Sequence, residues 1–585
     1  MTSAFFLAFV WFLLGHQAAA PSQENVRPIT VWTTHSLQKV RPGDATPPTL
    51  PHDVQLFAAQ NEFEPFQIVL RANAAAVNNV DVDVTDLAGP AGVIGADAHV
   101  TIYLEKYMTI ATPSSIEGAA GEWPDPLVPK VDRYTGERRN AFPLKLAPGR
   151  NQPLWIEVYV PLGTPPGVYR GAATIKADSA FVDSVPITLE VWNFALPSTS
   201  SFPTSFGFNG IGAMREHFGR YTSDRDLLDL TRVYQKAALL HRLSTHGGSM
   251  VPPRIPQGAE SIDWSRYDGE MAPLLDGTLL TSRDPLPGAT ATTAELRVPP
   301  GLTEAQRRPY YQQWIRHFRE KKWLDKLFLY LWDEPTPEKF DQVATRGRAA
   351  HQSDREVRNL VTIAWNSDLA GVVDIWTPLI NCLEAKPGFP PYCDVSAPMA
   401  KYSPELAAGK RLWWYQSCAS HGCNIVGGEY FRGWPSYMID TPPVGNRIFQ
   451  WLAWEYRIGG ELYFNTNEAY QQPANGGKDP WDSVLLFGGN GDGTLFYPGT
   501  PARIGGTTQI PIESIRLKLI REGLEDYEYL HLCEAAGLQP LAKRVASSMA
   551  TNLYSWDHRP ESLYVYRRQM GEALSKATPS KSGGR

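Results

Sequence analysis

The pattern of apolar residues changes near residue 200, and this change restricts the possible folds more than any other feature of the chain. Between residues 25 and 197, short alternating or apolar runs are separated by Pro and Gly, and no long stretch has helical periodicity. Such runs are typical of the strands of an antiparallel sandwich. The clearest runs lie at residues 29–33, 64–71, 80–84, 154–160 and 185–192. We therefore predict a β-sandwich domain over residues 25–197.

Beyond residue 200, apolar runs alternate with segments of helical periodicity, which favours strands alternating with helices. One helix start is marked by Thr336, Pro337 and Glu338, which supply a cap, a Pro in the first turn and an acid near the positive helix end. Eight strand–helix units indicate a (β/α)8 barrel. The eight candidate strands are residues 204–208, 242–245, 294–298, 327–332, 359–364, 373–379, 411–416 and 461–465.

The expected fold is therefore multidomain, with an N-terminal antiparallel β-sandwich followed by an α/β (β/α)8 barrel and C-terminal helices. We assign residues 200–552 to the barrel, with closing helices within 511–552. Residues 553–585 form a C-terminal extension, and its polar end from Lys576 is expected to be disordered.

The first 20 residues have the features of a cleaved export signal. The apolar run 4–14 is too short to span a bilayer, and Ala18, Ala19 and Ala20 supply small residues for a cleavage site. An uncleaved anchor is the alternative. No Cys follows the run, which argues against a lipoprotein, and no later run is apolar enough to span a membrane. We expect a secreted or periplasmic protein with no membrane span after cleavage.

Charge and cysteine content exclude several other classes of protein. The net charge is −6 and no basic run occurs, so the sequence gives no reason to expect nucleic acid as a partner. Two Cys pairs, Cys382 with Cys393 and Cys418 with Cys423, are either short-loop disulfides or buried thiols. Zinc is not expected, because no CxxC motif or paired His accompanies them. Phosphate and dinucleotide motifs are absent from the sequence, so no metal or cofactor is implied.

Two adjacent acids, Asp333 and Glu334, follow the apolar strand predicted at 327–332. Active sites of α/β barrels lie at the carboxyl ends of the strands. Acids at such a position cost desolvation energy, which favours a chemical role. The alternative is that they only begin a solvated loop or approach the next helix N-terminus. Sugar hydrolysis is a reaction that needs such acids, because one must protonate the leaving oxygen.

The source of the second catalytic group separates two mechanisms. A conventional retaining enzyme needs a carboxylate nucleophile from another strand, and Glu468, after the last candidate strand, is the one obvious candidate. Alternatively, a 2-acetamido group of the substrate attacks the anomeric carbon while an enzyme acid orients the amide. An adjacent pair such as Asp333 and Glu334 suits this second scheme.

Several motifs resemble glycoside hydrolase family 123, the β-N-acetylgalactosaminidase family in which a β-sandwich precedes the catalytic barrel. The matching segments are Leu-Trp-Asp-Glu-Pro at 331–335, Leu-Trp-Trp-Tyr at 412–415, Gly-Glu-Leu-Tyr-Phe at 460–464, Asn-Glu-Phe-Glu-Pro-Phe-Gln at 61–67 and Pro-Gly-Val-Tyr-Arg-Gly at 166–171. The most specific is Ser-Ile-Arg-Leu-Lys-Leu-Ile-Arg-Glu-Gly-Leu-Glu-Asp-Tyr-Glu-Tyr at 514–529. The resemblance covers nearly the whole chain after the signal.

The resemblance implies an exo-acting, retaining β-N-acetylgalactosaminidase or β-N-acetylhexosaminidase that acts on a glycan or glycoconjugate. Glu334 matches the general acid/base, and Asp333 matches the residue that orients the acetamide. Tyr415 is a candidate donor to the acetamide carbonyl. Further candidate substrate contacts, each of which can equally belong to the core, are Trp332, Trp365, Trp414, His246, Asn366, Tyr463, Asn465 and Glu468.

Two rival functions stay open at this point. One is a glycosidase for a different linkage with a conventional nucleophile such as Glu468. The other is a non-catalytic, carbohydrate-binding surface protein. Neither the configuration of the sugar nor the aglycone follows from the sequence.

Overall fold

The computed structural model describes most of the chain. The described residues are Met1, 28–248, 252–256, 260–393, 398–423, 428–471 and 476–577. The predicted export signal lies outside them apart from Met1, and so do residues 578–585 at the end of the predicted tail. Within the described residues, no helix has both the length and the apolarity needed to cross a membrane.

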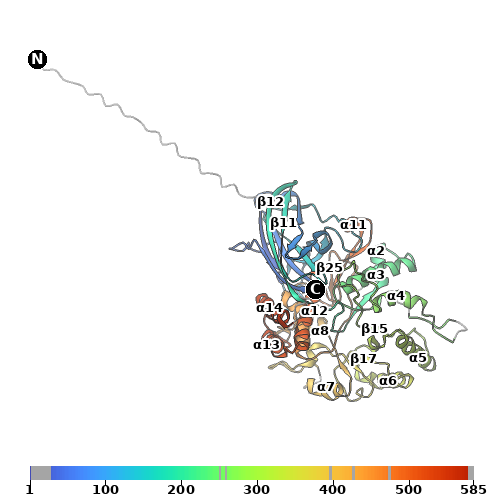
Figure 1. Cartoon of the computed structure of the whole chain (residues 1–585). Coiled ribbons are helices and arrows are strands. Elements are labelled where there is room, and N and C mark those ends of the chain that lie inside the picture. The colour runs from blue at the N-terminus through green and yellow to red at the C-terminus, as the bar shows by residue number, and fades with distance from the viewer. Residues whose placement is uncertain are drawn as a thin grey trace, which may run out of the picture.

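The N-terminal part consists of two facing β-sheets (Figure 1). The first sheet has the order β1 (Ile29–His35), β3 (Glu62–Ala72), β10 (Asn151–Val160), β7 (Val100–Ile110), β8 (Gly121–Pro129), β25 (Ile510–Ser514), β24 (Phe496–Gly499). The second has the order β2 (Val54–Gln60), β12 (Ala180–Ala195), β11 (Gly167–Ala177), β4 (Val77–Val84), β9 (Leu144–Leu146), with β5 (Leu87–Gly89) and β6 (Gly92–Ile94) beside β11.

Alternating side chains of these strands fill one core between the sheets. Ile68 and Leu70 of β3 pack in the same buried cluster as Ile187 and Leu189 of β12. Residues two apart on a strand point to the same face, which explains why the alternating sequence pattern predicted this region. All strand pairs in the two sheets are antiparallel except β2 with β12, which is parallel.

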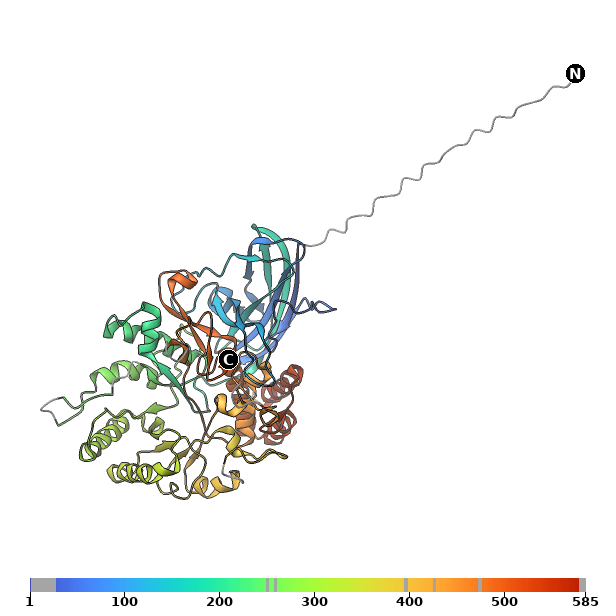
Figure 2. The ribbon, with the colours of Figure 1, turned by 180° about the vertical axis from the view of Figure 1, so that it is seen from behind.

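The sandwich also contains two strands from the far end of the chain. β25 pairs with β8 through Glu513 opposite Leu127, and β24 pairs with β25. Figure 2 shows this orange hairpin beside the blue strands. The sequence pattern predicts that residues 496–514 belong to the second domain, so the structure joins the two parts more closely than the predicted boundary at 197 suggests.

The second part contains parallel strands that overlap all eight predicted positions, although β14 shares only Thr245 with the predicted strand at 242–245. One sheet has the order β14 (Thr245–Gly248), β13 (Thr204–Asn209), β21 (Glu461–Tyr463), β20 (Trp414–Tyr415). The other has the order β15 (Ala294–Glu295), β16 (Leu327–Trp332), β17 (Asn359–Val361), β18 (Ile375–Trp376), β19 (Arg411–Leu412). An isolated parallel bridge between Leu379 and Tyr415 links the two sheets.

These pairings form two parallel sheets, and among the described residues no ladder joins β14 to β15. The pairings therefore do not confirm the closed (β/α)8 barrel that the sequence predicts. β15 comprises only two residues, and Pro299 and Pro300 follow closely. Since Pro lacks a backbone N–H, the ladder cannot continue through them.

Helices surround the parallel strands. They are α2 (Gly210–Phe218), α3 (Asp224–Leu240), α4 (Ser265–Leu275), α5 (Glu304–Glu320), α6 (Phe340–Ser353), α7 (Pro398–Ala407), α8 (Cys418–His421), α9 (Pro443–Arg447) and α10 (Phe449–Glu455). The remaining short elements are α1 (Ala96–His99), α11 (Pro501–Ile504), β22 (Leu485–Leu486), β23 (Gly489–Asn490), β26 (Ala550–Asn552) and β27 (Ser555–Trp556).

Three C-terminal helices pack beside the lower end of the sandwich, where Figure 1 draws them in red and orange. They are α12 (Ile515–Ala535), α13 (Gln539–Met549) and α14 (Pro560–Ala577). α12 contacts β8 of the sandwich as well as α9, α10 and α14, and α14 packs on β12. The predicted C-terminal extension therefore contains β27 and α14, and helix α14 continues through Lys576 to Ala577.

Candidate active site

The two adjacent acids lie where β16 ends. Strand β16 is apolar and begins buried, and its last three residues become partly exposed. Asp333 and Glu334 then reach solvent, while Pro335 is buried. Glu334 has a φ of 41°, in the left-handed region that a non-glycine residue adopts at an energetic cost. The chain therefore bends at the two acids, directly after the strand.

Thr362, immediately after β17, connects the two acids. Its hydroxyl accepts a hydrogen bond from the Glu334 backbone N–H at 2.8 Å and donates one to Asp333 Oδ1 at 2.8 Å. Tyr330, on β16, donates a second hydrogen bond to Asp333 Oδ1 at 2.7 Å. Two donors therefore fix the Asp333 carboxylate, and the same threonine fixes the backbone turn at Glu334.

Tyr415, at the end of β20, donates a hydrogen bond to Glu334 Oε1 at 2.5 Å. Burial raises the pKa of the Tyr415 hydroxyl, and the Glu334 carboxylate raises it further. Burial and the nearby Asp333 carboxylate raise the pKa of Tyr330 in the same way. Both phenols consequently stay protonated at ordinary pH and act as hydrogen-bond donors to the acid pair.

A pocket of about 440 Å³ opens beside Glu334. This volume lies within the range of small-molecule sites. Glu334 is the one acid among the described residues that line it. The lining residues are Glu334, Pro335, Pro337, Phe340, Thr362, Ile363, Ala364, Trp365, Asn366, Leu379, Cys382, Tyr392, Cys393 and Tyr415.

Of the predicted substrate contacts, Trp365, Asn366 and Tyr415 line this pocket. The Trp365 indole Nε1 donates to Glu405 at 3.2 Å, and Asn366 Oδ1 accepts from the backbone of Asp368 at 2.8 Å. These contacts hold both side chains in place at the end of the β17 segment.

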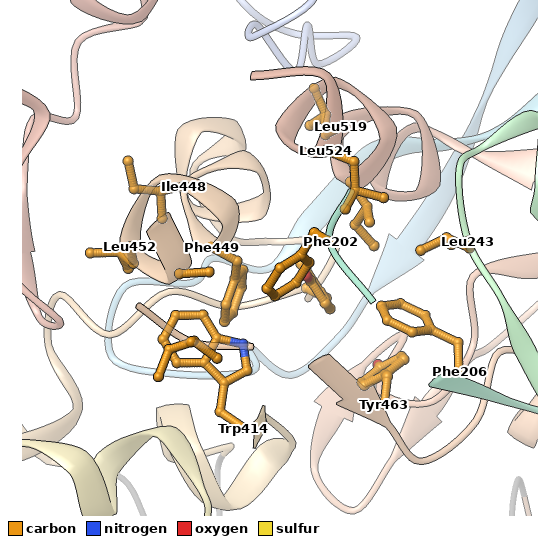
Figure 3. Close-up of a cluster of buried hydrophobic side chains, with 14 of the residues drawn as sticks. Phe202, Phe206, Leu243, Trp414, Ile448, Phe449, Leu452, Tyr463, Leu519 and Leu524 are labelled. Atoms are coloured by element: carbon orange, nitrogen blue, oxygen red, sulfur yellow. The ribbon is translucent and has the colours of Figure 1, made fainter. Parts of the chain in front are cut away.

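Three predicted aromatic contacts lie elsewhere. Figure 3 shows Trp414 and Tyr463 within a cluster of buried hydrophobic side chains, and they are 1% and 0% exposed. Trp332 is partly buried against the same cluster, with the Arg346 guanidinium 4.5 Å from its ring centre. The structure thus places all three in packing positions, and none of them lines the pocket.

His246 lies behind the acid pair. Its Nδ1 lies 3.1 Å from the Ser205 hydroxyl, and its ring meets that of Tyr330 edge-on at 6.4 Å. Burial lowers the pKa of His246 to about 4, so the imidazole is neutral at ordinary pH. We therefore read His246 as a neutral support for Tyr330.

Glu468, the conventional nucleophile candidate, does not line the pocket. Its carboxylate accepts hydrogen bonds from the side-chain amides of Asn465 and of Gln471, the latter at 2.8 Å. Asn465, another predicted contact, is therefore engaged with Glu468, and the structure does not bring this pair to Glu334.

Sequence reasoning missed Thr362, Tyr330 and Tyr392. Thr362 lies within the fifth candidate strand, 359–364, and directly follows β17, so the rule that sites lie at strand ends could have indicated it. Tyr330 lies on β16 three residues before Asp333 and could have been considered on the same basis. Tyr392 gives no local signal, because it lies in a loop outside the candidate strands, next to Cys393 of the disulfide to Cys382.

Both predicted cysteine pairs are disulfides in the structure, Cys382 with Cys393 and Cys418 with Cys423. The described residues contain one cluster of possible metal ligands, formed by Cys418, His421 and Cys423. Since the two sulfurs are bonded to each other, neither supplies the thiolate that a metal ion requires. This cluster does not fit a metal site.

A second cavity, of about 450 Å³, lies between the sandwich and α14. It is lined by residues of β1, β2, β3, β12 and α14 and their neighbours, and by none from the parallel sheets. It contains no adjacent pair of acids. The pocket beside Glu334 is therefore the candidate active site.

Adjacent acids at the carboxyl end of a parallel strand, one of which lines a ligand-sized pocket, are compatible with a glycoside hydrolase. Comparison with family models supports this class. The model "Glycoside hydrolase 123, catalytic domain" matches residues 303–533, and "Glycoside hydrolase 123 N-terminal domain" matches residues 44–177. The two models together cover more than half of the chain. The chain belongs to glycoside hydrolase family 123, which confirms the resemblance seen in the sequence.

Comparison with solved structures supports the same fold. A family 123 glycoside hydrolase from Clostridium perfringens, reported with the details of glycolipid glycan hydrolysis, matches with a TM-score of 0.65 and 13% identity. The match covers 94% of this chain and 98% of that one. A search of curated proteins found no significant match.

Other glycoside hydrolases match more weakly. A family 39 enzyme from Bacteroides cellulosilyticus has a TM-score of 0.28 and 10% identity, over 66% of this chain and 74% of that one. A family 5 xyloglucanase from Bacteroides ovatus has a TM-score of 0.24 and 9% identity, over 81% and 98%. At these scores neither structure bears on the fold or function.

Proposed function

We propose that this glycoside hydrolase is an exo-acting, retaining β-N-acetylhexosaminidase, with terminal N-acetylgalactosamine as the first expected sugar, and that the substrate's 2-acetamido group is the nucleophile. One observation carries the proposal. Glu334 is the single acid among the described residues lining the pocket, and Asp333 adjoins it. A conventional retaining enzyme needs a second carboxylate about 5–5.5 Å away across the scissile bond.

In the first step of this mechanism, the acetamide oxygen attacks the anomeric carbon as the glycosidic bond breaks. Glu334 gives its proton to the leaving oxygen, and an oxazolinium ion forms. Asp333, fixed by Tyr330 and Thr362, accepts a hydrogen bond from the acetamide N–H and stabilises the positive charge.

In the second step, Glu334 removes a proton from water, and the resulting hydroxide attacks the anomeric carbon from the side that the aglycone has left. Two inversions give overall retention. Tyr415 can transfer its hydrogen bond from Glu334 to the acetamide carbonyl, because its protonated hydroxyl lies beside the carboxylate.

We also propose that the two parallel sheets form one barrel-like catalytic unit. β13 is the first of these strands in the chain and β21 is the last, and the two pair directly with each other. The link from β20 to the β18 segment is the Leu379–Tyr415 bridge. Two contacts support closure on the remaining side, since β14 and β15 lie close together and Glu295 is hydrogen-bonded at Gly247.

Export of the protein is a further part of this proposal. The N-terminal segment 1–20 supports it, and so do the two disulfides, which persist in oxidising compartments. Mass spectrometry of the mature protein from its native host tests it, and a chain that retains its first residues would overturn cleavage.

Hydrolysis of paired chromogenic glycosides tests the mechanism. We expect turnover of the β-N-acetylgalactosamine or β-N-acetylglucosamine glycoside and none of the same sugars without the acetamide. Asp333→Asn should lower kcat by on the order of a hundred-fold, because a neutral amide cannot stabilise the oxazolinium charge. Activity on plain hexosides would overturn acetamide participation.

Thr362 offers a graded control in the same assay. Thr362→Val removes the hydroxyl shared by both acids and should lower kcat on the order of ten-fold, less than Asp333→Asn, because Tyr330 still holds Asp333. Thr362→Ser keeps the hydroxyl and should stay close to wild type. Equal activities of the Val and Ser variants would show that the bridge does not position the acids.

A further inference from the structure

The loop that follows Cys382 forms one edge of the catalytic pocket and presents exposed aromatic rings. Tyr392 lines the pocket together with Glu334, and both Tyr392 and Phe389 are 37% exposed. Large aromatic side chains on the rim of a polar site lose contact with water when a ligand covers them, so they favour binding.

The loop is held in place at both ends. The Cys382–Cys393 disulfide closes it. Near its start, the Glu384 carboxylate accepts hydrogen bonds from the Tyr456 hydroxyl at 2.5 Å and from the Leu553 backbone at 3.0 Å. A surface fixed before binding loses less conformational entropy when a ligand arrives.

Lys386 ties the middle of the loop to a neighbouring turn. Its ammonium donates to three backbone carbonyls, those of Glu429 at 3.2 Å, Tyr430 at 2.8 Å and Arg432 at 2.7 Å. The same ammonium lies 5.4 Å from the Phe389 ring centre. The lysine thus orders the aromatic residues around it.

The rings form a stack that ends at the pocket. Tyr392 and Tyr430 are stacked, with centres 5.4 Å apart and planes inclined by 16°. Phe389 meets Tyr430 edge-on at 5.7 Å. Tyr430 therefore backs one face of Tyr392 and restricts its rotation.

The side of the pocket on which Tyr392 lies indicates what it contacts. A general acid must reach the oxygen of the bond that breaks, so the leaving part of the substrate lies on the side of Glu334. Tyr392 lines the same pocket as Glu334, and burial together with the Glu334 carboxylate raises the pKa of its phenol. The leaving sugar must pass close to this ring.

We propose that Tyr392, backed by Tyr430 and Phe389, is the platform for the sugar ring next to the one that is cleaved. The C–H face of a pyranose is apolar and packs on an aromatic ring. This assignment rests on the proposed role of Glu334 as acid, and it gives the enzyme a preference for oligosaccharide over single-sugar substrates.

The test compares two substrates with the same cleaved sugar. One is a disaccharide of β-linked N-acetylgalactosamine on galactose, and the other is N-acetylgalactosaminyl β-fluoride, whose leaving group cannot reach a platform. Tyr392→Ala should lower the ratio of kcat/KM for disaccharide to fluoride on the order of ten-fold. Tyr392→Phe keeps the ring and should keep the ratio. An unchanged ratio in Tyr392→Ala would overturn the platform.

A binding measurement separates this proposal from the proposed reaction. In the Glu334→Gln background, calorimetry with the disaccharide and with free N-acetylgalactosamine should show that Tyr392→Ala weakens only the disaccharide, by a similar factor. Loss of disaccharide affinity supports the platform even if the wild-type enzyme hydrolyses neither substrate. The absence of hydrolysis would count against the proposed reaction but not against the platform. Equal weakening of both ligands would place Tyr392 at the cleaved sugar and overturn the platform.

Discussion

Glu334→Gln is expected to lower kcat on a natural glycan by on the order of a thousand-fold. The amide has nearly the shape of the acid and can still accept the Tyr415 hydrogen bond, but it has no proton to give the leaving oxygen. Steady-state kinetics on an unactivated oligosaccharide measure this loss. The melting temperature should stay close to wild type, because the Glu334 side chain is exposed.

The leaving group supplies an internal control for this prediction. In a 2,4-dinitrophenyl glycoside the leaving 2,4-dinitrophenolate departs without protonation, so the first step should be far less impaired in Glu334→Gln than it is with an oligosaccharide. Asp333→Asn should lower the rate of this first step with both substrates, because both react through the oxazolinium ion. Glu338→Gln changes an exposed acid four residues downstream and should leave kcat unchanged. A Glu334→Gln enzyme that keeps a tenth of its activity on oligosaccharide would contradict the acid role.

The acid pair could be predicted from sequence because its signal is local. An apolar strand followed directly by two acids and a Pro is visible within nine residues, 327–335. The sequence does not show which aromatic candidates reach the pocket and which belong to the core. Trp414 and Tyr415 are neighbours on β20, where side chains alternate, and only the three-dimensional packing shows that Tyr415 reaches Glu334 while Trp414 enters the core.

Non-local contacts explain what the sequence could not predict about the fold. The strand-only and strand–helix regions were recognisable from periodicity. The pairing of β25 with β8, however, joins residues more than 380 positions apart, as in Glu513 opposite Leu127. A five-residue strand carries no information about such a distant partner. Tyr392 likewise lies in the pocket beside a disulfide between two residues, Cys382 and Cys393, that are not neighbours in the sequence.

Helix α12 contains most of the segment 514–529, which resembles family 123 most specifically. It places ionisable side chains where several elements meet. Arg567 of α14 contacts carboxylates from both the sandwich and α12, namely Glu62, Glu64, Glu522, Glu525 and Asp526. Arg447 of α9 forms two hydrogen bonds with Asp526, at 2.7 and 2.8 Å, and an ion pair with Glu522 at 3.3 Å. These side chains are almost completely buried, so each charge depends on its partners.

Arg447→Met is therefore expected to lower the free energy of unfolding by about 3–5 kcal/mol, because it removes one cationic partner from two buried carboxylates, Glu522 and Asp526. Denaturant unfolding measures the change. Arg432→Met, which breaks the exposed pair with Glu429, is the matched control and should cost about 1 kcal/mol or less. Similar losses in the two variants would show that the buried cluster does not depend on Arg447.

The pH dependence of the Arg447→Met loss identifies its cause. Burial and neighbouring carboxylates raise the pKa of Glu522 well above its ordinary value. A folded-state pKa above the unfolded one means that the folded protein holds a proton more readily, so stability is greatest at low pH and falls as pH rises through the folded pKa. Arg447→Met should consequently lose less stability at pH 5 than at pH 8, and adding Glu522→Gln should recover part of the loss at pH 8. A loss that is independent of pH and unaffected by Glu522→Gln would instead indicate a packing defect, because neither acidification nor an amide refills the space left by the guanidinium.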